Sequence, residues 1–187
     1  MQVVELFFEK RLQVSTIARI YAPSLCIDYS PSANDVSNGI SSSDLHIYVR
    51  YITDSTQAYR ATGRSCKYVS SLTLPDNTLQ QGRPTIGLIK FNTNKIIDGE
   101  TALTNRLFAS ITATSMHETI HILGFDTALF NTFLDPATGA VHATTMTGPT
   151  LLDGSRNSNY ILETPFVRAW TRDFFGCNTL GGMALEN

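Results

Sequence analysis

The stretch Ala102–Leu123 constrains the fold most, because it contains neither glycine nor proline and predicts one long helix. Gly124 follows directly, and glycine is the residue that most often ends a helix in a left-handed conformation. A helical wheel places larger apolar residues on one side of this helix, which we expect to face the core. They are Phe108, Met116, Ile120 and Leu123.

Residues 117–121 lie near the end of this stretch and read His-Glu-Thr-Ile-His, the H-E-x-x-H pattern. Positions i and i+4 of a helix differ by only about 40°, so His117 and His121 project from one face, one turn apart. Two imidazole nitrogens so arranged can occupy adjacent corners of a zinc tetrahedron. Glu118 lies about 100° further round the helix. It can therefore act as general acid and base with a zinc-activated water, which predicts amide hydrolysis without a covalent enzyme adduct.

The pattern is specific, since composition alone gives a chance match in about 0.003 of such chains. Its helical context agrees, because the expected ligand face also carries Ser110 and Thr114, which are small and leave room for a metal. The structural alternative is a pair of histidines held by hydrogen bonds in an interface.

A catalytic zinc site needs three protein ligands, and this pattern supplies two. The usual third histidine, ten residues after the first, is replaced by Thr127. His142 is the only downstream histidine, and it is either a ligand brought round by a loop or a solvated side chain. Glu163 is a candidate carboxylate ligand of the thermolysin type, although Gly124 argues against that class.

Two other titratable residues have weaker interpretations. Asp126 follows the motif closely and is either a partner of a ligand histidine or a turn residue. His46 lies on a predicted strand, where we expect a structural or exposed role.

The rest of the chain predicts one α+β domain over residues 1–187, with a twisted, mostly parallel sheet packed on the long helix. Helices are expected at Val3–Leu12 and at Pro165–Phe175, the latter between an N-cap at Thr164 and a stop at Gly176. Strands are expected at Val14–Tyr21, Leu45–Tyr51, Cys66–Ser71 and Thr85–Phe91. Loops or irregular segments are expected at Ser30–Ser43, Leu74–Pro84, Asp135–Gly154 and Asn178–Asn187.

Charge and hydropathy exclude several classes of protein. The chain has 14 Lys and Arg against 16 Asp and Glu, so no basic excess exists to bind nucleic acid. It contains no apolar run of about 18 residues that predicts a transmembrane segment. Glu5 and Glu9 interrupt the apolar N-terminal stretch, which does not resemble a secretory signal. The chain is thus expected to be intracellular or to begin part-way along a longer protein.

The three cysteines form no C-x-x-C pair, which excludes a zinc ribbon or a thioredoxin-type site. In an oxidising compartment Cys26 and Cys66 can form a disulfide and leave Cys177 without a partner. The alternative is three buried thiols.

Residues Met116–Phe125, reading Met-His-Glu-Thr-Ile-His-Ile-Leu-Gly-Phe, resemble the active-site helix of the leishmanolysin family, a branch of the metzincin zinc peptidases. Gly82–Asn92 and Ser43–Val49 resemble strands that precede this helix. Thr164–Cys177 and Leu180–Asn187 resemble the stretch that leads to the third zinc ligand. The resemblance extends over nearly the whole chain, and the motif is its most specific part.

The resemblance implies a metzincin-like zincin catalytic domain of α+β class, with a twisted mixed sheet packed on a long active-site helix and its C-terminal part missing. In that family an insertion separates the position of Gly124 from the third zinc histidine, so one Zn²⁺ would take its third ligand beyond the end of this chain. The resemblance also implies a Cys26–Cys66 disulfide, a partner for Cys177 past the end, and a cell-surface or secreted location.

The function expected from the motif and the resemblance is zinc-dependent endopeptidase action on proteins or peptides. His117 and His121 would bind zinc and Glu118 would be the general acid and base. The substrate would lie extended along an edge strand, expected at Thr85–Phe91. The alternatives are an inactive relative that serves as a binding or adhesion module, and a small cytosolic domain without a metal.

Overall fold

The computed structural model describes residues 17–69, 72–73, 79–80, 82–96, 104–126 and 161–185, together with residues 4, 8, 14, 129–130, 133, 135, 138, 140 and 146–147. The chain divides into two compact units, residues 1–126 and residues 127–187, and each is described by itself. Helices and strands occur together in both units, so the predicted α+β class is confirmed.

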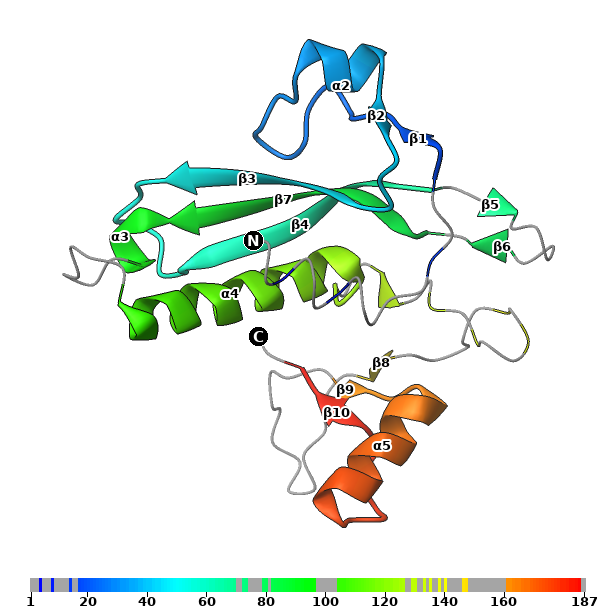
Figure 1. Ribbon diagram of the computed structural model, residues 1–187. Helices are drawn as coiled ribbons and strands as arrows, with labels where there is room; N and C mark the ends of the chain where they lie inside the picture. Colours follow the sequence, from blue (N-terminus) through cyan, green and yellow to red (C-terminus); the bar gives the residue numbers. More distant parts are fainter. Residues whose placement is uncertain are drawn as a thin grey trace. The chain divides into compact units, whose positions relative to one another are not determined.

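The first unit is built on a three-stranded mixed sheet in the order β3-β7-β4 (Figure 1). Its strands are β3 (His46–Ile52), β4 (Ala61–Tyr68) and β7 (Pro84–Asn92). β7 pairs in parallel with β3, where Tyr48 opposes Leu88, and antiparallel with β4, where Gly63 opposes Ile89. The strands predicted at Leu45–Tyr51 and Thr85–Phe91 are confirmed. The second is paired on both sides, so the expectation that it is an edge strand is wrong.

β7 contributes to a core on each face of the sheet, which explains its nearly continuous apolar sequence. On one face Ile86 and Leu88 pack with Tyr48 and with residues of the N-terminal segment. On the other face Ile89 and Phe91 pack with Ala61 of β4 and Ile122 of the long helix.

Short elements cover the face of the sheet that carries Tyr48: β1 (Arg19–Ile20), β2 (Ile40–Ser41) and α2 (Ala33–Ser37) (Figure 1). Ser32 caps α2 by accepting from Asp35 N, and the Tyr48 hydroxyl donates to the Asp35 carboxylate at 2.8 Å. The prediction of a loop over Ser30–Ser43 is therefore wrong, because α2 and β2 lie within it. The strand predicted at Val14–Tyr21 is reduced to Arg19–Ile20 among the described residues.

The long helix α4 runs from Asn105 to Leu123 and covers the other face of the sheet (Figure 1). Thr104 caps its first turn through a bond from Leu107 N, and Gly124 ends it with φ 128°. It follows the short helix α3 (Thr93–Ile96). The predicted helix and its glycine stop are confirmed over the described residues.

The prediction of which side of α4 faces the core is wrong. Its buried residues are Ser115, Glu118, Thr119 and Ile122, of which only Ile122 is apolar. Phe108 and Ile120, which were expected in the core, are exposed. Two glycines of the sheet explain this choice, because a Cβ at Gly63 or Gly87 would collide with Glu118 or Ile122. The hydroxyls of Ser115 and Thr119 donate to carbonyls of the helix itself, Ile111 O and Ser115 O, so their burial leaves no donor unsatisfied.

A disulfide joins Cys26 to Cys66 of β4, as the family resemblance implied. The pairing of β4 with β7 shifts register between Ser65 and Lys67, around the disulfide cysteine. Of the strand expected at Cys66–Ser71, residues 66–68 form the end of β4, and residues 70–71 lie outside the described residues. Two further short strands, β5 (Leu72–Thr73) and β6 (Leu79–Gln80), pair antiparallel. β5 directly precedes the loop predicted at Leu74–Pro84, and β6 lies within it, so that prediction is wrong at β6.

The second unit contains helix α5 (Pro165–Phe175), whose predicted limits, Thr164 N-cap and Gly176 stop are all confirmed. Three short antiparallel strands accompany it in the order β10-β9-β8: β8 (Met146–Thr147), β9 (Ile161–Leu162) and β10 (Met183–Ala184). Arg168 and Arg172 of α5 donate to the carbonyl oxygens of Gly181 and Leu180. The expectation of no regular structure at Asn178–Asn187 is thus wrong at β10.

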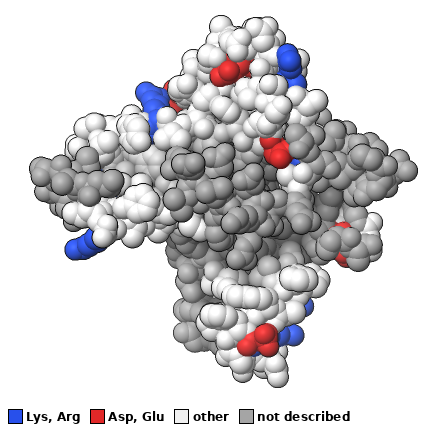
Figure 2. Space-filling view, in the orientation of Figure 1, with Lys and Arg blue, Asp and Glu red and all other residues white. Residues whose placement is uncertain are grey.

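Among the described helices, none has both the length and the hydropathy needed to cross a membrane. Figure 2 shows the charged side chains on one face scattered across the described surface rather than gathered in one place.

Candidate metal centre

His117 and His121 lie one turn apart near the end of α4, and their rings converge. The Nε2 atoms are 3.1 Å apart, and the rings meet edge to face with centroids separated by 4.7 Å. His117 is exposed and His121 is half-buried, so the pair is accessible from one side. The helical spacing of the motif thus brings two ring nitrogens together, as expected from the sequence.

The tautomer of His121 follows from its hydrogen bonds. Its Nδ1 lies 2.7 Å from the carbonyl oxygen of Phe125, and a carbonyl can only accept. In the neutral imidazole Nδ1 therefore carries the proton, and Nε2, which lies 3.1 Å from His117 Nε2, keeps the lone pair. A backbone carbonyl bound to Nδ1 is also the usual support of a metal-binding histidine.

The turn that carries His121 is held by further hydrogen bonds. Gly124 N and Phe125 N donate back to His121 O and Ile120 O at 3.2 and 3.1 Å. The positive φ of Gly124 lets the chain reverse here, so that the Phe125 carbonyl comes to face the His121 ring. The glycine of the motif therefore contributes to the orientation of a histidine as well as to the end of the helix.

Glu118 lies on the buried side of α4 and is only 6% exposed. Its backbone abuts Gly63 of β4 so closely that a Cβ on Gly63 would be 2.8 Å from Glu118 Cβ. A second contact lies two residues further along β4, where the Ser65 hydroxyl donates to Ile122 O at 2.7 Å. Strand β4 thus lies directly against the motif.

The profile of the leishmanolysin family matches residues 3–187, which is nearly the entire chain. The chain belongs to the leishmanolysin family. A comparison with curated proteins finds no match to it. Members of the leishmanolysin family are zinc metallopeptidases, and the mixed α+β structure described above fits a leishmanolysin domain.

The geometry of the histidine pair can be tested against the zinc that this family uses. Zn–N distances of about 2.0–2.1 Å at a tetrahedral angle separate two ligand nitrogens by roughly 3.3–3.4 Å. The observed 3.1 Å separation of the Nε2 atoms is close to this value. The pair therefore fits two corners of a tetrahedral site with little movement of either ring.

The described residues contain no group of three His, Cys, Asp or Glu side chains that could hold a metal ion. Thr127 and His142 lie outside the described residues, so the expectations on them stay predictions. Glu163 belongs to the second unit, where its carboxylate lies 3.8 Å from Arg168. Asp126 lies in the bend that follows Gly124.

His46 is on β3, as expected, and its ring packs edge to face on Tyr48 with centroids 4.6 Å apart. Burial lowers its pKa below the ordinary value of 6.5, and the nearby Asp35 carboxylate opposes this shift. It borders a cavity of about 690 Å³ that Leu45, Ile47, Thr119 and Leu123 also line. His46 therefore has a structural environment distinct from that of the histidine pair.

Sequence reasoning missed Gly63 and Ser65, which contact Glu118 of the motif and Ile122 directly after it from a strand some fifty residues earlier in the chain. One signal existed, since an isolated glycine in a strand often marks a close approach of another backbone. That signal does not say which element approaches, because the partner is distant in sequence.

Proposed function

We propose that the chain is a zinc-dependent metalloendopeptidase that hydrolyses peptide bonds in proteins. The observation that carries this proposal is the convergence of His117 Nε2 and His121 Nε2 at 3.1 Å, with the His121 tautomer set by the Phe125 carbonyl. Membership of the leishmanolysin family supports the same function. His117 and His121 are the proposed ligands of one Zn²⁺, and a third ligand completes the site.

Zinc, when bound, lowers the pKa of water and polarises a carbonyl group. We assign the proton transfers to Glu118, which neighbours His117 and is buried against β4. Its carboxylate accepts a proton from the attacking water and then delivers it to the leaving amine. The backbone of α4, held against Gly63, fixes the position of this carboxylate relative to the two rings.

A peptide substrate of a metzincin-like domain lies extended along the edge of the sheet. Since β7 is paired on both sides, we assign this role to β4, whose second edge has no partner among the described strands. β4 also lies next to the histidine helix, where Gly63 and Ser65 contact it. Main-chain hydrogen bonds to this edge would hold the scissile bond near the proposed metal.

The second candidate function is an inactive leishmanolysin relative that serves as a binding or adhesion module. It is motivated by the sequence motif, which supplies two histidines where a catalytic zinc site needs three protein ligands. The two functions differ in turnover, since only the first predicts hydrolysis of peptides.

Zinc content by mass spectrometry and hydrolysis of a quenched fluorescent peptide library test the proposal together. We expect bound zinc and hydrolysis in the wild type, zinc without hydrolysis in Glu118→Gln, and loss of both in His121→Ala. Asp173→Asn, which changes an exposed carboxylate on α5, is the matched control and should behave as the wild type. Zinc without hydrolysis in the wild type would favour the binding module, and an active Glu118→Gln would remove the role assigned to Glu118.

A further inference from the structure

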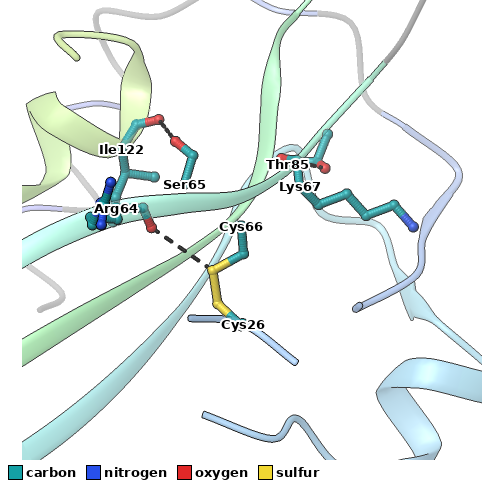
Figure 3. Close-up of a disulfide and its surroundings, with 7 residues drawn as sticks. All are labelled: Cys26, Arg64, Ser65, Cys66, Lys67, Thr85 and Ile122. Carbon is teal, nitrogen blue, oxygen red and sulfur yellow. Dashed lines mark hydrogen bonds between the residues drawn. A yellow bond between two sulfur atoms is a disulfide. The ribbon is translucent and has the colours of Figure 1, made fainter. Parts of the chain in front are cut away.

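Strand β4 makes a side-chain hydrogen bond to the last turn of α4. The Ser65 hydroxyl donates to the carbonyl oxygen of Ile122 at 2.7 Å. Ile122 directly follows His121 in the chain, so this bond reaches the residue next to a proposed zinc ligand. Figure 3 shows Ser65 pointing from β4 toward Ile122.

The Ile122 carbonyl is one of the last four of the helix, which lack a partner within the helix. Ser65 supplies that partner. The side chain of Ile122 is fully buried, and it is seated over Gly87 so closely that a Cβ there would be 2.5 Å from its Cγ2. Ile122 is therefore fixed to the sheet through both its side chain and its backbone.

The other bonds of this turn have a different effect. Those of Gly124, Phe125 and the His121 ring all close within residues 120–125. They give the turn its shape, but they do not set its position relative to the sheet. The Ser65 bond does, because its donor belongs to β4.

Ser65 is itself held in place by its neighbour. Cys66 forms the disulfide with Cys26 on the opposite side of β4 (Figure 3). Because the disulfide restrains β4 at Cys66, the neighbouring Ser65 hydroxyl is also restrained. A displacement of the end of α4 would therefore lengthen the hydrogen bond between Ser65 and the Ile122 carbonyl.

We propose that Ser65 is a positioning residue for the histidine pair: its hydroxyl sets where the turn that carries His121 lies relative to β4. This inference rests on the proposed zinc site, because its consequence is a well-placed His121 Nε2. Ser65 acts through the backbone of Ile122, whose carbonyl oxygen accepts its hydrogen bond.

The first experiment needs no metal. Amide hydrogen exchange of the wild type, Ser65→Ala and Ser65→Thr is measured with chelator present. We expect the Gly124 and Phe125 amides to exchange about fivefold faster in Ser65→Ala, as loss of one hydrogen bond predicts, and to recover in Ser65→Thr, which keeps the hydroxyl. Thr62→Ala, on the face of β4 that does not meet α4, is the control and should leave these amides unchanged. Unchanged exchange in Ser65→Ala would overturn the proposal.

The second experiment titrates the same proteins with Co²⁺ alone and follows its visible absorption bands, which report on the ligands. We expect Ser65→Ala to bind Co²⁺ about fivefold more weakly with altered band intensities, while Ser65→Thr and Thr62→Ala match the wild type. Equal affinity and spectra in the wild type and Ser65→Ala would overturn the positioning role. If the wild type binds no Co²⁺ and only the exchange result is positive, the zinc proposal fails and Ser65 is reduced to a structural contact.

Discussion

Gly63 of β4 and Glu118 of α4 lie in direct backbone contact, and a Cβ on Gly63 would come 2.8 Å from the Cβ of Glu118. Real Cβ atoms do not approach so closely, so any other residue at position 63 must displace the helix or the strand. The residue proposed to move protons is therefore positioned by a residue that has no side chain. This contact links the edge of the sheet to the chemistry proposed for the motif.

Gly63→Ala should destabilise the protein and reduce hydrolysis. The added methyl group overpacks the interface of β4 and α4, which typically costs about 1–3 kcal/mol of unfolding free energy. Urea unfolding and peptide hydrolysis measure the two effects. Gly181→Ala is the matched control, since a Cβ there meets nothing within 4 Å. Equal stability and activity of Gly63→Ala and the wild type would contradict the contact.

Removal of the disulfide should lower stability without a change in fold. The Cys26–Cys66 bond closes a loop with a sequence separation of 40. A loop of that size corresponds to about 4 kcal/mol in the chain-entropy account of disulfides. The double variant Cys26→Ala, Cys66→Ala should therefore unfold at a lower urea concentration. Cys177→Ala, which removes the free thiol, should unfold at the wild-type midpoint; a shift of equal size in both would refute the assignment.

The lowered pKa of His46 predicts that the stability of the protein depends on pH. Burial lowers its pKa in the folded protein below 6.5, so the unfolded chain binds a proton first as the pH falls. The unfolding free energy should therefore decrease as the pH falls below 6.5 toward the folded pKa, and it should rise again with pH. Unfolding of the wild type and His46→Gln at pH 5 to 8, with chelator present, measures the contribution as the difference in slope. Parallel curves for the two proteins would show that His46 contributes nothing.

Zinc should stabilise the folded protein through the histidine pair. A ligand that binds only the folded state raises the unfolding free energy by about 2.7 kcal/mol at a concentration 100 times its dissociation constant. Thermal unfolding with and without zinc should show a higher midpoint for the wild type and for the His46→Gln control. His121→Ala should show no such rise, and an unchanged rise would place the zinc elsewhere.

The sequence predicted most reliably those elements whose limits are set by local chemistry. α5 begins after Thr164 at Pro165 and ends at Gly176, because a capping hydroxyl, a proline at the first position and a left-handed glycine each act within a few residues. The alternating pattern of β3 and the apolar run of β7 are also local. α2 was missed because its five residues carry no apolar period, and a single Ser32 cap supports it.

In the candidate site, too, the local features were predicted from the sequence and the long-range contacts were not. The placement of His117 and His121 on one face follows from helix geometry, and their spacing predicted it. The buried face of α4 did not follow from hydrophobicity, because Glu118 and Ile122 lie close against Gly63 and Gly87 of the sheet. Polar Ser115 and Thr119 are buried on this helix as well. The contact of Ser65 with Ile122 joins residues 57 positions apart, and no local pattern marks such a pair.

The central position of β7 also affects how the chain assembles during synthesis. β3 and β4 precede β7, yet each pairs with β7 rather than with the other. As the ribosome extends the chain from the N-terminus, both strands must wait without a partner until Asn92 has left the exit tunnel. Long-range pairing of this kind slows folding and leaves strands open to wrong association. Between the emergence of His46 and that of Asn92, the growing chain therefore carries two strands whose common partner has not yet been completed.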